Sequence, residues 1–145
     1  MADYVLSKGY PVLSTYNSSA AAGVLAYRVV KMSGAGSGLI DLCTDATATT
    51  LQVGVVQENV DQVKVATGKA VANVAVMGVA KCVVNATPGT INVGTRVMCG
   101  STGGVIAAAT TGSKVLGICV GATTLTGTIA AGDIIDVQLT PGVLF

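Results

Sequence analysis

The chain has no His and no Trp, and its charged and aromatic residues are few. Charged side chains make up 10% of the 145 residues, against an average of about 25% in globular domains. Histidine is the side chain that most often exchanges protons near neutral pH, so its absence argues against acid–base catalysis. Asp133 and Asp136, the closest approach to a carboxylate pair, instead fit a turn and a solvated strand. We therefore expect that this protein is not an enzyme and has no catalytic residues.

Clusters of positive charge are also missing. The net charge is +1, and the Lys and Arg residues are scattered along the chain, so no group of them can neutralise successive phosphates. With one Phe and four Tyr, the chain lacks aromatic platforms on which single-stranded bases could stack. We expect no nucleic-acid partner.

The sequence has no stretch with the length and apolarity of a membrane-spanning helix. The uncharged stretch between Lys114 and Asp133 is interrupted by Gly and Thr, which fits two strands and a turn. The opening Met1-Ala2-Asp3 lacks the basic residues and the apolar run of a secretory signal. We expect no membrane partner and assembly in a cytoplasm.

Metal and cofactor motifs are missing as well. The four cysteines are far apart in the sequence, at positions Cys43, Cys82, Cys99 and Cys119. Metal-binding cysteines usually occur in closely spaced pairs, so we expect no metal site and reduced, packed thiols, with a disulfide left open. The glycine-rich residues 33–38 lack the spacing and the following helix of a phosphate-binding loop. We expect no cofactor.

What the sequence does contain favours extended backbone. Val, Ala, Gly and Thr together account for 80 of the 145 residues. Branching at Cβ fits Val and Thr to a pleated sheet, and Gly supplies the backbone angles of tight turns. Short apolar runs separated by Gly-rich turns at intervals of roughly 8–12 residues are typical of sandwiches and barrels. We predict an all-β fold, a small β-barrel or β-sandwich of short strands with Gly-rich turns.

Several runs are specific strand candidates. We expect strands at residues 24–32, 39–42, 51–57, 71–84, 114–120 and 134–139, and extended backbone at residues 63–65. Within the longest run, Gly78 is expected to mark a bulge or a close backbone approach. Residues 140–145 are expected to form a tail.

One phrase occurs twice. Residues 51–56 read LQVGVV and residues 115–120 read VLGICV, with Gly54 and Gly117 inside the two runs. Each copy is followed by a turn-like stretch and then by another extended run. The two copies could be related halves of the protein, or two equivalent edges of one barrel.

The first 22 residues differ from the rest of the chain. Tyr4, Tyr10 and Tyr16 lie there, and an Asn-Ser-Ser turn follows them. The segment could be an extended N-terminal arm that makes contacts with a partner, or an N-terminal strand that packs on its own core. We predict an arm at residues 1–22 and a β-barrel-like domain at residues 23–145. The mean hydropathy of +0.71 and the sparse charge imply a large uncharged surface, and such surfaces mark contacts in a homo-oligomer or a lattice.

A series of short phrases over most of the chain completes the sequence evidence. In order, these phrases are Val53-Gly54-Val55, Met77-Gly78-Val79, Val93-Gly94-Thr95-Arg96-Val97, Gly103-Gly104-Val105, Leu116-Gly117-Ile118, Ala131-Gly132-Asp133 and Val137-Gln138-Leu139. From about Ala22 to Leu139, the chain resembles the capsid cement, or head-decoration, proteins of tailed bacteriophages.

The resemblance implies a structural virion protein on the outer surface of a capsid. It implies a compact β-barrel-like domain, often a homotrimer, that binds between subunits of the major capsid protein and stabilises the expanded shell. The expected partners are therefore the major capsid protein and further copies of this chain. In this setting we expect Tyr4, Tyr10 and Tyr16 to contact the capsid or a neighbouring copy.

Two other functions remain open. The chain could be a subunit that assembles by itself into a shell or fibre. It could also be a ligand-binding β-module, although such sites depend on aromatic platforms and clustered polar groups, and the predicted domain has almost no aromatic residues.

Overall fold

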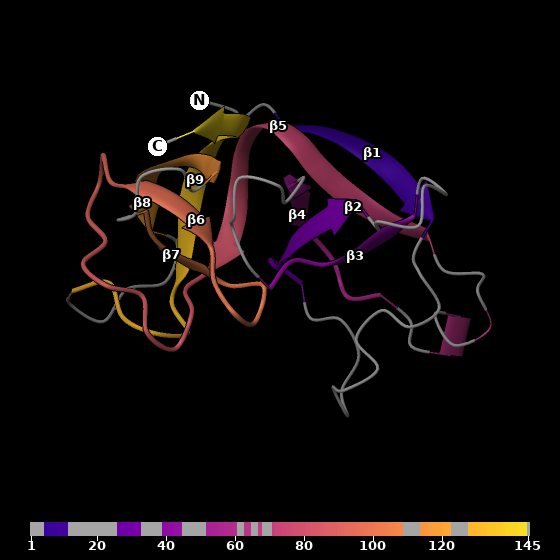
Figure 1. Cartoon of the computed structure of the whole chain (residues 1–145), viewed down its shortest axis with the longest axis horizontal. Coiled ribbons are helices and arrows are strands. Elements are labelled where there is room, and N and C mark those ends of the chain that lie inside the picture. Colours follow the sequence, from indigo (N-terminus) through magenta and orange to yellow (C-terminus); the bar gives the residue numbers. More distant parts are fainter. Residues whose placement is uncertain are drawn as a thin grey trace.

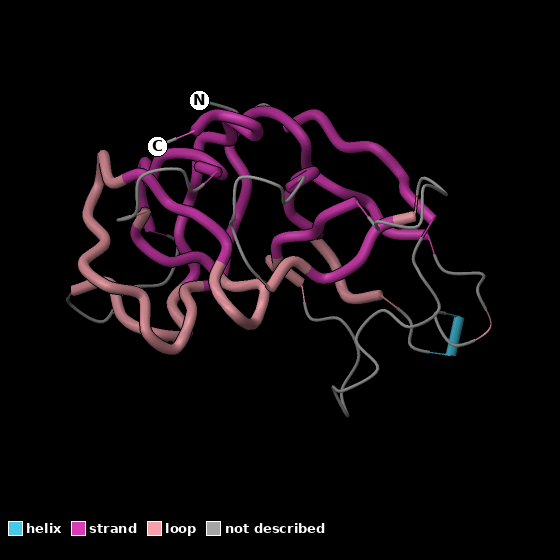
Figure 2. Tube along the Cα trace, in the orientation of Figure 1, coloured by secondary structure: helices cyan, strands magenta, loops and turns pink. Residues whose placement is uncertain are grey.

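The computed structural model is almost entirely β in its regular structure (Figures 1 and 2), which confirms the predicted fold class. It describes residues 5–11, 26–32, 39–44, 52–60, 63–64, 67, 71–108, 114–122 and 128–144. The nine strands formed by these residues are β1 (Val5–Pro11), β2 (Val29–Met32), β3 (Ile40–Leu42), β4 (Gln52–Val56), β5 (Val71–Val83), β6 (Arg96–Cys99), β7 (Val105–Ala107), β8 (Lys114–Ala122) and β9 (Ile134–Leu144). The predicted boundary between the arm and the domain falls outside the described residues and stays a prediction.

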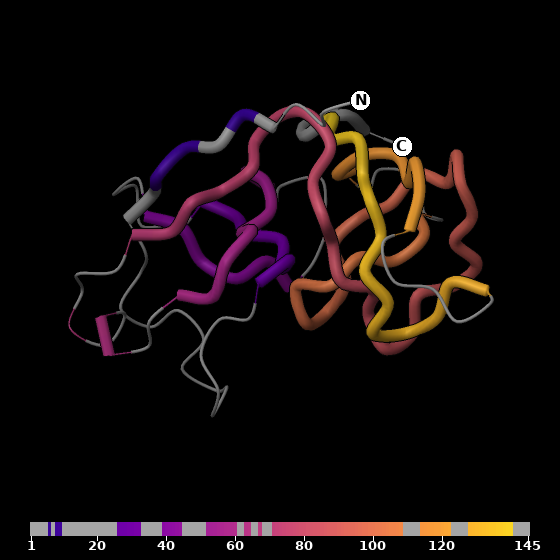
Figure 3. Tube along the Cα trace, turned by 180° about the vertical axis from the view of Figure 1, so that it is seen from behind, coloured from indigo at the N-terminus to yellow at the C-terminus, as the bar shows by residue number. Residues whose placement is uncertain are grey.

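The strands form one continuous sheet that is folded into two lobes. Its order is β3-β2-β4-β5-β9-β8-β6-β7, and β1 pairs with β5 beside this path. β5 is 13 residues long and arches from one lobe to the other (Figure 1), as the view from behind also shows (Figure 3). We call β1–β4 with residues 71–78 of β5 lobe 1, and residues 79–83 of β5 with β6–β9 lobe 2.

β5 changes lobes at Gly78. This residue has a φ of +89°, a value that glycine adopts without the steric cost that a Cβ would bring. Just before it, Leu6 pairs with Met77 and Ser7 pairs with Ala75, so one residue of β5 is left over. The predicted irregularity at Gly78 is therefore confirmed, and it lets one strand serve two lobes.

Lobe 2 closes on itself to form a barrel. The chain leaving β5 returns to the outer edge of β7, where Val84 and Val105 form a parallel bridge. The backbone N–H of Asn85 then donates to the carbonyl of Val105 at 3.0 Å. This contact joins the two ends of the five-stranded path β5-β9-β8-β6-β7.

The two lobes repeat the same strand pairing. In lobe 1, β2 lies between β3 and β4, and in lobe 2, β6 lies between β7 and β8. The register agrees over the rows that both lobes share, whereas the shift between Val30 and Lys31 in the β2–β4 pairing has no counterpart between β6 and β8. The equivalent rows are Leu42–Val30–Gly54 in lobe 1 and Ala107–Val97–Gly117 in lobe 2. The phrases around Gly54 and Gly117 are therefore equivalent strands of two related halves, as the first of the two alternatives proposed.

The repeat extends to the remaining strands. Val55 pairs with Ala75 in lobe 1, and Ile118 pairs with Gln138 in lobe 2. β1 pairs with the first half of β5 in the way that the second half of β5 pairs with β9. Ser7–Ala75 and Pro11–Val71 thus correspond to Val79–Gln138 and Val83–Ile134. β5 is both the last strand of lobe 1 and the first strand of lobe 2.

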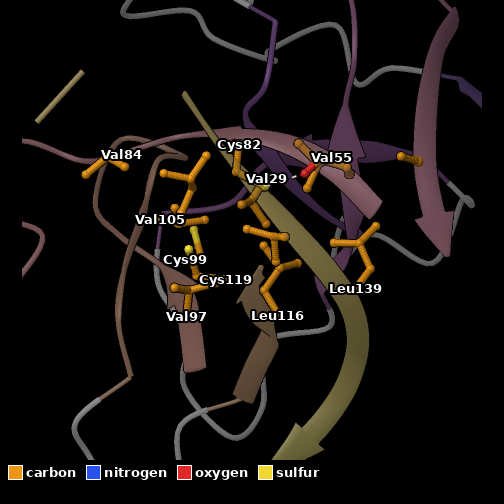
Figure 4. Packing of buried hydrophobic residues seen from close by; sticks show 14 of the residues in the cluster. Val29, Val55, Cys82, Val84, Val97, Cys99, Val105, Leu116, Cys119 and Leu139 are labelled. Carbon is orange, nitrogen blue, oxygen red and sulfur yellow. Dashed lines mark hydrogen bonds between the residues drawn. The ribbon is translucent and has the colours of Figure 1, made fainter. Parts of the chain in front are cut away.

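Each lobe has a core of corresponding residues. The core of lobe 1 includes Val30, Ile40, Val56, Ala72 and Val74, and the equivalent residues Val97, Val105, Cys119, Ile135 and Val137 belong to the core of lobe 2. The opposite face of lobe 1, with Val29, Val55 and Ala75, joins the lobe 2 core as well. Figure 4 shows Val29 and Val55 among lobe 2 side chains such as Leu116 and Leu139.

On the corresponding face of lobe 2, two of the three equivalent positions are open to solvent and the third, Ile118, is half-buried. Where lobe 1 has Val29 and Ala75, lobe 2 has Arg96 and Gln138, and both of these are exposed. Polar side chains at these positions disfavour the packing of a third lobe on this face, as the polar outer faces of capping repeats do in repeat proteins.

Backbone and side-chain hydrogen bonds hold the lobes together along β5. The amide group of Gln57 bonds both backbone groups of Lys81: its Nε2 donates to the carbonyl at 3.2 Å and its Oε1 accepts from the N–H at 3.2 Å. The N–H of Val83 donates to the carbonyl of Tyr27 at 3.0 Å. Gln57 directly follows β4, and its side chain thus adds two hydrogen bonds to β5 beyond the backbone pairing of the two strands.

Two local predictions are wrong. Residues 63 and 64 are helical rather than extended, and the N–H of Thr67 donates to the carbonyl of Val63 at 3.2 Å, as in a helical turn. The expected tail is a continuation of β9, which ends at Leu144. Leu139 and Val143 pair with Gly117 and Val115, so Pro141 lies in a bulge, where it need not donate to the ladder.

Candidate interaction surface

The candidate site is a surface rather than a pocket of reactive groups. Large apolar side chains are exposed at six described positions: Leu6, Val63, Val71, Met77, Val93 and Val120. Three of them, Leu6, Val71 and Met77, belong to β1 and the half of β5 that β1 pairs with. We call these two segments, residues 5–11 and 71–78, the β1–β5 ribbon.

The ribbon places two apolar side chains directly opposite each other. Leu6 and Met77 are register partners, and 43% of Leu6 and 57% of Met77 are exposed. Val71, at the other end of the ribbon, is 65% exposed and lies opposite Pro11. Large apolar groups that stay in water are candidates for contacts with another molecule.

The polar groups of the ribbon are few. Lys8 is its one charged residue, and both Lys8 and Asn73 are exposed. Nδ2 of Asn73 donates to Oε1 of Glu58 at 2.9 Å. The described side chains of the ribbon therefore form a mainly apolar surface.

The ribbon contains only part of the predicted tyrosine site. Tyr10 lies in β1, and its backbone pairs with Ala72. Tyr4, Tyr16 and the side chain of Tyr10 lie outside the described parts of the chain, so their predicted contacts stay a prediction. For residues 5–11, the structure shows a strand paired with its own domain, the second of the two alternatives for this segment.

Sequence reasoning did not single out Leu6 or Met77. In β5 the apolar residues are continuous, so alternation cannot tell which of Val76 and Met77 is exposed. The available signal is Gly78, because the register irregularity beside it interrupts the alternation of β5. Ala75 is buried, whereas Met77 is exposed.

The cysteines are structural groups. All four are buried and none forms a disulfide. Burial raises the pKa of the Cys82 thiol well above its ordinary range, and the nearby Asp136 carboxylate and Cys119 add to the rise. Burial also raises the pKa of Cys119. Both thiols therefore stay protonated at neutral pH, where they are poor nucleophiles and poor metal ligands.

The described residues contain no group of three or more His, Cys, Asp or Glu side chains arranged to hold a metal ion. None of the helical segments described is long and apolar enough to cross a membrane.

Comparison with known proteins finds a likeness among solved structures. No protein-family model and no curated protein matches the chain. A solved structure, the N base of head fiber gp8.5 from bacteriophage phi29, superposes with a TM-score of 0.59 and covers 94% of this chain and 95% of its own. The two sequences are 16% identical. At that identity, the likeness establishes a shared fold.

Proposed function

We propose that this chain is a structural protein of a bacteriophage head, with no catalytic role. It binds the outer surface of the capsid between subunits of the major capsid protein and stabilises the shell. The observation that carries the proposal is the fold shared with the base of a phage head fiber over 94% of this chain. The short phrases that resemble cement proteins point to the same part of the virion.

The β1–β5 ribbon is the part of the molecule that we assign to capsid contact. Its exposed side chains Leu6, Val71 and Met77 would leave water on docking, and each Å² of apolar surface buried contributes about 25 cal/mol. A single ribbon is a small interface. Three ribbons in a homotrimer bind more tightly, because the first contact raises the effective concentration of the other two.

The test is co-sedimentation of the purified protein with expanded heads that lack it, together with its mass by light scattering. A trimer that pellets with heads at a saturable ratio supports the proposal. A protein that stays in the supernatant at every concentration contradicts it.

The surface assignment needs matched variants. Leu6→Asn with Met77→Asn should weaken head binding by at least tenfold, whereas Val93→Asn should leave it unchanged. Val93 is a suitable control because 70% of it is exposed and it lies just before β6 of lobe 2, outside the ribbon. Equal head binding by both variants would show that the capsid contact lies outside the β1–β5 ribbon.

The predicted tyrosine contacts need substitutions rather than a truncation. Residues 5–11 form a strand of the sheet, so removing the arm would remove part of lobe 1. Tyr4→Ala and Tyr16→Ala avoid this, because both positions lie outside β1. A loss of head binding in either variant, with an unchanged free energy of unfolding, would support an arm that contacts the capsid.

A second candidate function is the base of a fiber. The name of the matching structure favours it, since that protein is the base of a head fiber. In this case the chain would bind the head on one side and carry another protein on the other. Electron microscopy separates the two functions: a cement protein covers the shell by itself, whereas a base leaves a free end on which fibers grow.

A further inference from the structure

Each lobe has a position for a fifth strand, and the two positions are filled differently. In lobe 2, residues 79–83 of β5 pair with β9, and they continue directly from lobe 1. In lobe 1, the equivalent position beside residues 71–78 is filled by β1. β1 is connected to the next described residue, Ala26, only through residues 12–25.

β1 is attached to the molecule at one edge. Among the described strands, its extensive contacts are with β5 alone. Leu6, Lys8 and Gly9 are all exposed, so these three residues add little burial. The described contact that holds β1 to the sheet is its backbone ladder with β5, which runs from Val5 to Pro11. None of the three described side chains belongs to the core cluster of either lobe.

The position is shaped for this particular segment. Gly9 pairs with Asn73, and a Cβ at residue 9 would lie 3.3 Å from Cγ1 of Val71, closer than ordinary contact. The irregularity between Leu6 and Ser7 matches the extra residue of β5. The position therefore favours a segment with a small residue at the third place from its end, as residues 5–11 have in Gly9.

We propose that β1 is exchanged between copies of this chain, so that residues 5–11 of one copy pair with residues 71–78 of a second copy. The exchanged pairing makes the same contacts as the pairing within one chain, which is why strand exchange is a common route to oligomers. The 14 residues from 12 to 25 set an upper limit of about 45 Å on the distance between β1 and the rest of its own chain. The proposal does not depend on a role in the virion.

The test uses the Leu6–Met77 pair. Residues directly opposite in an antiparallel ladder have Cα atoms about 4.5–5.5 Å apart, a distance that a disulfide can bridge. The double variant Leu6→Cys with Met77→Cys is assembled at high protein concentration, oxidised, and separated on a denaturing gel without reductant. The native cysteines are buried and do not compete. Leu6→Cys with Val93→Cys is the control, because Val93 is not a register partner of Leu6.

Each outcome decides the proposal. We expect covalent oligomers in which the new thiol at position 6 of one chain is bonded to the new thiol at position 77 of another, at least fivefold more abundant than in the control. A product that is only monomeric, with the same bond inside one chain, would overturn the exchange while confirming the register. A double variant that forms no disulfide at all would contradict both the pairing of Leu6 with Met77 and the exchange of β1. Head binding is measured separately, so failure here leaves the proposed function standing.

Discussion

Gly54 and Gly117 occupy the same place in the two lobes, each beside a carbonyl oxygen of the next strand. A Cβ at Gly54 would lie 2.0 Å from the oxygen of Ala75, and a Cβ at Gly117 would lie 2.1 Å from the oxygen of Gln138. The spacing between glycine and carbonyl along the sequence is also the same in both lobes. The repeat therefore preserves a backbone contact as well as a strand order.

This contact predicts that alanine is not tolerated at either glycine. We expect Gly54→Ala and Gly117→Ala each to lower the free energy of unfolding by about 2–3 kcal/mol, because strands must separate to admit the methyl group. Gly121→Ala in the same strand β8 is the control, since its Cβ would meet nothing closer than 3.6 Å. Urea unfolding measures all three. A control as unstable as the other two would show that strand glycines in general, and not the carbonyl contact, matter.

The difference between the faces of the two lobes makes a second prediction. Val29 is fully buried between the lobes, and its equivalent Arg96 is exposed. Val29→Thr should cost about 1–3 kcal/mol, because it places a hydroxyl in an apolar contact without a partner. Arg96→Thr should change the free energy of unfolding by less than about 0.5 kcal/mol. Equal effects would contradict the assignment of Val29 to the contact between lobes.

A third prediction concerns the Gln57 bridge. Gln57→Ala leaves both backbone groups of Lys81 without the bonds that they now make with Gln57, and should cost about 1 kcal/mol. Hydrogen exchange of the Lys81 amide should become faster, while amides inside lobe 2 exchange at their former rates. Gln138→Ala serves as the control, because its exposed side chain makes only a long 3.4 Å bond to Gly78. Unchanged protection of the Lys81 amide from hydrogen exchange would show that Gln57 does not stabilise the contact between the lobes.

A fourth prediction concerns alkaline pH. Burial raises the pKa of Cys82 above its ordinary value of about 9, so the folded protein keeps this proton while the unfolded chain loses it. The stabilisation is complete below pH 9 and declines above it, by up to about 1.4 kcal/mol per pH unit for each such thiol. The free energy of unfolding between pH 7 and pH 11 should therefore fall less steeply in Cys82→Ala than in the parent protein. Parallel curves would exclude Cys82 as a source of alkaline instability.

The fold class was predictable because its signals are local. Val and Thr favour extended backbone wherever they occur, and Gly54 and Gly117 stand out against the apolar residues around them. The irregularity at Gly78 was predictable for the same reason. These features depend on neighbours in the sequence, and the structure places most strands within a few residues of the predicted runs.

The features that were not predictable depend on partners far away in the sequence. Proline has no backbone N–H to donate, so Pro141 by itself predicts that no strand continues there. The strand continues because Pro141 lies in the bulge opposite Leu116, where no donor is needed. Val63 and Val65 alternate with Lys64 as a strand would, yet residues 63 and 64 are helical. The two lobes could not be foreseen, because the phrase around Gly54 is too short to establish a repeat without the register of β5. Leu6 was missed as a surface residue since its exposure depends on how β1 pairs.

The sharing of β5 determines how the molecule carries tension. No linker separates the lobes, because the backbone that ends one lobe begins the other at Gly78. A force that pulls the lobes apart along β5 acts parallel to this strand. It shears the backbone hydrogen bonds that pair β5 with β1, β4 and β9, and in this direction many of these bonds must break at once. Pulling the two lobes apart along β5 therefore means breaking strand ladders, since the molecule has no slack linker there to extend.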